Sequence, residues 1–222
     1  LEDSIRVLGT DHPSTLTSRF DLAGAYRAAG RLSEAIPLYE QVFSGRSRVL
    51  GPDHRSTLTA RDELAGAYWE AGRLDEAITL KKQILADAVR IMGPGSSGAS
   101  AARLNLADAY RDAGRLDEAI PLFEQNLNDV TRTLGPHHPE VLASRHSLAG
   151  AYRDAGRLDE SITLHQENLD DVARVMGPHH PETLASRATL AGIYRDAGRL
   201  DEAIPLFEQN LEDRTRTLGL DH

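Results

Sequence analysis

The chain has 222 residues, of which 40% are hydrophobic and 27% charged, the balance of an ordinary folded protein. It contains no cysteine, which excludes disulfides, thiolate zinc sites and cysteine nucleophiles and is compatible with a reducing cytoplasm. Its formal charge of −9 has the wrong sign for general affinity to nucleic acid or anionic lipid. No apolar run approaches the roughly 18 residues needed to span a bilayer, and no signal peptide is visible, so we expect a cytoplasmic protein. Since it begins at Leu1 rather than methionine, we expect a piece of a longer one.

One glycine recurs every 42 residues along the whole chain: Gly9, Gly51, Gly93, Gly135, Gly177 and Gly219. A second glycine keeps the same spacing: Gly30, Gly72, Gly114, Gly156 and Gly198. These ladders predict five units, at residues 10–51, 52–93, 94–135, 136–177 and 178–219. Residues 1–9 precede them as a stub that matches residues 211–219, so we expect a single array over 1–222.

Each unit is predicted to hold two helices. In the fourth unit the first helix runs from about Glu140 to Ala155, after Pro139, and ends at Gly156, because glycine adopts the left-handed conformation at lowest cost. A second helix follows and ends at the next glycine of the ladder. In the last unit Pro205 places the start of the second helix near residues 200–202, because proline is tolerated only near a helix start. The unusual link at residues 93–100 predicts a looser helix start in the third unit and a hinge there.

A lone helix pair with such small interface residues cannot bury its apolar face, whereas stacked pairs can. The contacts are predicted to be alanines at two repeated positions, with Ser161 as the exception: Ala23, Ala65, Ala107, Ala149 and Ala191; Ala35, Ala77, Ala119 and Ala203. We therefore expect an all-α solenoid of stacked antiparallel helix pairs.

The fourth unit and its copies resemble the tetratricopeptide repeat, with Leu148, Ala149 and Tyr152 on the first helix and Gly156 in the turn. The 42-residue period and the Leu-Gly-Pro-x-His-Pro link, as at residues 134–139, are similar to the longer subclass found in kinesin light chains and many bacterial multi-domain proteins. The resemblance implies a right-handed superhelix whose inner face, formed by the first helices, holds extended peptides.

Carried over unit by unit, the resemblance places these side chains on the inner face: Phe20, Arg27, Asp62, Trp69, Leu104, Asp108, Arg111, Asp112, His146, Arg153, Asp154, Arg195 and Asp196. One position of the repeat holds a different residue in every unit, as the recognition of different ligand side chains would require: Phe20, Asp62, Leu104, His146 and Ala188. Trp69 is the only tryptophan and is the first candidate for an anchor, with packing against a neighbouring helix as the alternative. Asp112, Asp154 and Asp196 are expected to neutralise part of the charge of the adjacent arginines.

Two further arginine ladders are predicted to be structural. Arg6, Arg48, Arg90, Arg132, Arg174 and Arg216 fall in the last turn of each second helix, where cations are stabilising. Arg19, Arg61, Arg103, Arg145 and Arg187 are expected to pair with acids such as Glu34, Glu76, Glu118, Glu160 and Glu202.

No metal site, cofactor or catalysis is expected. The histidine pairs at 137–138 and 179–180 repeat with the link and have no third ligand at a coordinating spacing. No phosphate-binding loop, nucleophile elbow or His-Glu-x-x-His motif occurs.

Three functions remain open. The first is a non-catalytic scaffold that binds a peptide or an extended partner segment in its groove. The second is a structural spacer or a self-assembling element, because the last second helix (residues 201–217) should expose apolar surface and promote end-to-end association. Nucleic-acid binding through the arginine ladders is the third, and the acidic charge and the lack of an aromatic stacking platform argue against it.

Overall fold

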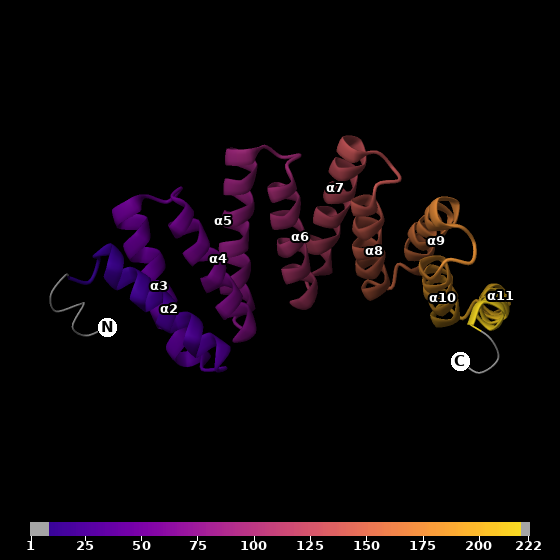
Figure 1. The fold of residues 1–222 in the computed structure, drawn as a ribbon, viewed down its shortest axis with the longest axis horizontal. Coiled ribbons are helices and arrows are strands. Elements are labelled where there is room, and N and C mark those ends of the chain that lie inside the picture. The colour runs from indigo at the N-terminus through magenta and orange to yellow at the C-terminus, as the bar shows by residue number, and fades with distance from the viewer. Residues whose placement is uncertain (1–8, 219–222) are drawn as a thin grey trace. The chain divides into compact units, whose positions relative to one another are not determined.

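The computed structural model describes residues 9–218, which form ten α-helices and no strand (Figure 1). The helices are α2 (Pro13–Ala28), α3 (Leu32–Leu50), α4 (Arg55–Glu70), α5 (Leu74–Met92), α6 (Ser97–Asp112), α7 (Leu116–Leu134), α8 (Pro139–Asp154), α9 (Leu158–Met176), α10 (Pro181–Asp196) and α11 (Leu200–Leu218). Every first helix has 16 residues and every second helix has 19. The expected all-α fold of five helix pairs is confirmed.

The chain forms two compact units, Leu1–Gly114 and Arg115–His222. In the first unit α2 packs on α3, α3 on α4, α4 on α5 and α5 on α6, so each helix contacts its neighbours in the chain. The second unit repeats this order from α7 to α11. Each unit is therefore a stack of helical hairpins, and long-range order comes from contacts between adjacent repeats.

Glycine ends the helices as predicted. Gly156 has φ of +73° after α8, and the amide of Arg157 donates to the carbonyl oxygen of Tyr152 at 2.8 Å. This six-to-one bond closes the last turn of the helix and needs a left-handed residue before it. The second helix then begins at once, at Leu158, and the corresponding helix α11 begins at Leu200, inside the predicted range.

The links start the first helices with side-chain caps. The Nδ1 atoms of His12, His54, His138 and His180 accept the amide of the residue two positions on. In the third link Ser96 replaces histidine, and its hydroxyl oxygen accepts the amide of Ala99 at 3.2 Å. Helix α6 therefore begins at the same repeat position as the others, and the prediction of a looser start was wrong because a different residue supplies the cap.

The core uses small residues where helices meet. The alanines at both predicted contact positions are 0–1% exposed, and Ser161 is fully buried in the same place. Larger apolar side chains fill the space between successive hairpins: Ile36 and Tyr39 of α3 pack in one cluster with Leu64 and Tyr68 of α4. Alanine allows the close approach, and the larger residues join one repeat to the next.

Buried arginines tie each first helix to the rest of its own hairpin. Arg61 pairs with Asp87, Arg145 with Asp171 and Arg187 with Asp213, each acid lying on the second helix of the same repeat. Arg19 and Arg103 donate to carbonyl oxygens of the preceding link, those of Thr10 and Pro94, as Arg187 does to that of Pro178.

The predicted partners of this ladder were wrong. The five glutamates that we assigned to it lie near the start of the second helices, and all five pair with the arginine three residues earlier: Arg31–Glu34, Arg73–Glu76, Arg115–Glu118, Arg157–Glu160 and Arg199–Glu202. Local helix geometry therefore pairs these acids with neighbouring arginines, and Arg61, Arg145 and Arg187 pair with acids 26 positions further along the chain.

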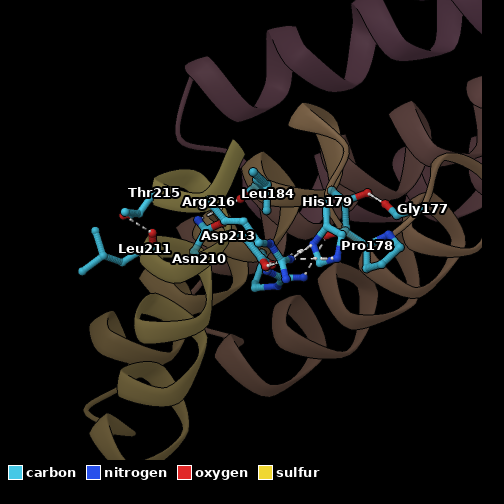
Figure 2. Close-up of polar contacts among 11 residues, drawn as sticks. Gly177, Pro178, His179, Leu184, Asn210, Leu211, Asp213, Thr215 and Arg216 are labelled. Carbon is cyan, nitrogen blue, oxygen red and sulfur yellow. Dashed lines mark hydrogen bonds and ion pairs between the residues drawn. The ribbon is translucent and has the colours of Figure 1, made fainter. Parts of the chain in front are cut away.

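The ladder at the ends of the second helices is structural, as expected. Arg216 lies 2.8 Å from Asp213 and 2.8 Å from Nδ1 of His179, so it joins α11 to the preceding link (Figure 2). Arg187 also donates to Asp213, and its hydrogen bond holds the pKa of that carboxyl below the ordinary value. Arg48 and Arg90 reach link residues Asp11 and Asp53 in the corresponding way. Arg6 lies outside the described residues.

Candidate partner-binding surface

A cavity of about 220 Å³ opens among three successive first helices of the first unit. Its lining comes from α2, α4 and α6 and from one residue of α5: Arg27, Gly66, Trp69, Glu70, Lys81, Asn105, Asp108 and Ala109. Three of the predicted site residues, Arg27, Trp69 and Asp108, therefore meet at one place. They come from three different repeats, which is the arrangement expected of a face built from first helices.

Arg27 closes one side of this cavity through a network of ion pairs. Its Nε and NH2 atoms lie 3.0 and 2.7 Å from Oε1 of Glu70, and NH1 lies 2.5 Å from Glu63, so α2 is joined to α4. The hydrogen bond to Glu70 raises the pKa of Arg27 and lowers the pKa of Glu70. Gly66 makes room for this pairing, because a Cβ there would lie 2.7 Å from NH2 of Arg27. The Arg27 charge is thus already balanced.

The other side of the cavity holds groups that are less fully paired with one another. Trp69 is half-buried, and Nζ of Lys81 lies 5.8 Å from its ring centroid, within the range of a cation–π contact. Burial raises the pKa of Asp108, and Arg111 lies 3.7 Å from its carboxylate. Asn105 is exposed at the rim and can both donate and accept a hydrogen bond.

The repeat explains why these residues meet. The 39-residue step from Arg27 to Gly66 recurs one unit later as the step from Trp69 to Asp108. The position of Asp108 is glycine in the other four units, at Gly24, Gly66, Gly150 and Gly192. Trp69 and Asp108 therefore line the cavity at the repeat positions that Arg27 and Gly66 hold one unit earlier.

The variable position on the first helices lies beside the second helix of the same repeat. Phe20 packs edge-on against Tyr39 of α3, with ring centroids 5.7 Å apart, and carries the Arg46 guanidinium over its face. In the fourth repeat His146 meets His165 at 5.4 Å in the same arrangement. Asp62 is exposed and Leu104 is half-buried. These residues are not among those that line the cavity, and Phe20 contributes to packing.

Two of the remaining candidate arginines lie beside the acids that were expected to neutralise them, whereas Arg111 lies 3.7 Å from Asp108. Arg195 lies 2.9 Å from Asp196, and Arg153 lies 3.8 Å from Asp154. All four side chains are exposed on the first helices of the second unit. Asp112 is also exposed, at the end of α6.

Sequence reasoning did not include Lys81, Asn105, Glu63 or Glu70 in the site. For Lys81 a signal was present: its column reads Tyr39, Lys81, Phe123, His165 and Phe207, so a single lysine interrupts a run of ring side chains. That column lies on the second helices, whereas the prediction considered only the first.

Among residues 9–218 no helix combines the length and the apolar character that spanning a membrane requires. No group of three or more histidine, aspartate or glutamate side chains in that range is arranged to hold a metal ion.

Tetratricopeptide repeat models match residues 1–48, 34–88, 98–167 and 145–216, and a second model of the same repeat matches 63–127. The chain belongs to the tetratricopeptide repeat family. The matches span most of the sequence, and the helix pairs of the structure are the hairpins of this repeat.

Solved structures support the kinesin-light-chain-like character of this tetratricopeptide repeat protein. The nearly identical TPR-like repeats of a putative kinesin light chain from Podosopora anserina are 35% identical, with a TM-score of 0.76 over 93% of this chain and 98% of that one. BtubC (BKLC) from P. vanneervenii is 17% identical, with a TM-score of 0.68 over 100% of this chain and 87% of that one, and shows the fold alone. No relative is found among curated proteins.

Tetratricopeptide repeats are generally protein–protein interaction scaffolds, and no enzyme family is indicated for this chain.

Proposed function

We propose that this tetratricopeptide repeat protein binds an extended segment of a partner protein along the first helices of its first unit. The segment would cross α2, α4 and α6, and one of its side chains would enter the cavity beside Trp69. The observation that carries the proposal is the meeting of Trp69 and Asp108, from different repeats, at one cavity.

The groups around the cavity suit a peptide. The half-buried indole of Trp69 offers a rigid apolar surface of the kind that anchors interfaces. Exposed Asn105 can hydrogen-bond a peptide backbone in either direction. Lys81 and Asp108 carry opposite charges at the cavity, so a polar or zwitterionic stretch is favoured over a strongly charged one.

Catalysis has no part in this proposal. The ordered ion pairs of the first unit, such as Arg27 with Glu70, hold neighbouring repeats together. The role of the chain would be to hold a partner in place, as is general for its family.

The experiment selects binding peptides from a random library displayed on phage and measures their affinity for the 222-residue chain. Because Trp69 is the only tryptophan, its fluorescence reports directly on the cavity. Selected peptides should shift this fluorescence, and the double variant Lys81→Ala, Asp108→Asn should weaken their binding at least tenfold.

The matched control is Asp170→Asn, which removes a carboxylate from an exposed site on the second helix α9, outside the cavity lining and the first helices. It should bind the peptides as the native chain does. Peptides that bind the double variant and the native chain equally well, without a change in Trp69 fluorescence, would contradict the proposal.

A further inference from the structure

Two helices that share their first twelve residues differ in how far their apolar faces are covered. Residues 114–127 and 198–211 are identical, and they begin α7 and α11. On α7 the side chains of Ile120 and Phe123 are 6% and 0% exposed. On α11 the corresponding Ile204 and Phe207 are 51% and 38% exposed, and Leu211 is 69% exposed.

The internal repeats show what covers this face. In the fourth repeat Ile162, which corresponds to Ile204, is 3% exposed and belongs to a cluster with Leu190, Ile193 and Tyr194 of the following first helix, α10. The covering element is therefore the first helix of the next hairpin.

A hydrogen bond recurs at the same joint. The hydroxyl of Tyr152 on α8 donates to Glu124 on α7 at 2.7 Å, and Tyr68 donates to Glu40 at 2.6 Å. Burial together with this bond raises the pKa of both tyrosines to about 12. On α11 the corresponding acid is Glu208, which is exposed.

Helix α2 carries the complementary face. Leu22, Ala25 and Tyr26 hold the positions of the Leu190, Ile193 and Tyr194 that cover Ile162. Ala25 is exposed, whereas its counterparts Ala67, Ala109 and Ala151 are all 0% exposed. Leu22 and Tyr26 are half-buried, whereas Leu64 and Leu148, two counterparts of Leu22, are 3% exposed.

We propose that α11 of one molecule binds α2 of a second copy of this chain, head to tail. Ile204, Phe207 and Leu211 would pack against Leu22 and Ala25 of the second copy, and Tyr26 would donate to Glu208. The contact reproduces the joint between α7 and α8. Because it uses two different faces, each copy keeps one face free, and association continues as an open chain.

The test measures the mass of the 222-residue chain by sedimentation velocity from micromolar to millimolar concentration. The native chain should rise above its monomer mass of 24.3 kDa as concentration increases, without reaching a fixed oligomer. Ile204→Glu on α11 and Ala25→Arg on α2 should each remain at the monomer mass. An equimolar mixture of the two variants should form a one-to-one pair and grow no further, because each variant keeps one intact face.

Val175→Glu is the matched control, because Val175 is 67% exposed on α9 and lies in neither face. It should associate as the native chain does, and all variants should first show native helical circular dichroism. A native chain that stays monomeric at all concentrations overturns the proposal, as does a mixture of the variants that does not pair. Association that survives Ala25→Arg but not Ile204→Glu would assign the contact to two copies of α11 and also overturn it.

Discussion

Arg145 on α8 lies 2.7 Å from Asp171 on α9, and both side chains are only 11% exposed. The pair joins the two helices of one repeat, and Arg174 and His137 contact the same carboxylate. Glu167 also lies 3.2 Å from Nε of Arg145, but its side chain is 51% exposed, so without Asp171 the desolvation of the buried guanidinium is only partly offset.

Asp171→Ala should therefore destabilise the chain by about 3 kcal/mol. The measurement is urea unfolding followed by circular dichroism at 222 nm. Glu160→Ala is the control, because its pair with Arg157 is exposed on both sides and surface pairs contribute little. Equal effects of the two substitutions would show that burial of the Arg145 pair has no energetic weight.

Stability should also fall at acid pH. Burial opposes ionisation of Asp87 and Asp171, but hydrogen bonds from Arg90 and Arg61 and from Arg145 and His137 hold the pKa of each below its ordinary value. Their contribution is therefore complete above the unfolded pKa near 4 and is lost as pH falls through the lower folded values. Thermal melts between pH 7 and pH 2 should show this loss, and Asp171→Asn should reduce its slope. An unchanged slope in that variant would contradict the assignment.

His165 should give a separate loss at higher pH. Burial lowers its pKa to about 4, so the folded chain keeps it neutral while the unfolded chain binds a proton near pH 6.5. Stability should decrease as pH falls from about 6.5 to about 4. His165→Phe, which places the residue of the third and fifth repeats there, should remove this decrease. His180→Asn is the control, because replacing an exposed cap residue should leave the decrease in place. Thermal melts of the native chain and of both variants across this pH range measure the decrease.

Two glycines should respond in opposite directions to alanine. Gly156 has φ of +73°, so Gly156→Ala should cost about 1 kcal/mol. Gly192 lies inside α10 with no atom within 4 Å of an added Cβ, so Gly192→Ala should stabilise by up to about 1 kcal/mol. Urea unfolding measures both. Destabilisation of similar size at both positions would mean that backbone conformation is not the cause.

The period and the glycines made the helices predictable, because turn conformation is a local property of Gly156 and its copies. The start of α11 at Leu200 followed from Pro205 for the same reason. Partners of the buried arginines were not predictable, because Arg145 reaches an acid 26 residues away and the angle between the helices decides which one. Two of the residues that line the cavity, Trp69 and Asp108, were placed on the inner face by the family resemblance. Lys81 reaches the cavity from a second helix, which the family pattern does not mark.

The order of helix contacts has a consequence for how the chain opens. Within the described residues α11 packs against α10, whereas α9 and α10 each pack against two neighbours. Fewer helix contacts are therefore broken when α11 separates than when α9 does. In a stack held by nearest-neighbour contacts, local unfolding starts at the helix with fewer contacts and spreads from there. Amide hydrogens of α11 should exchange first and those of α9 later, which gives the second unit a gradient of protection rather than one cooperative threshold.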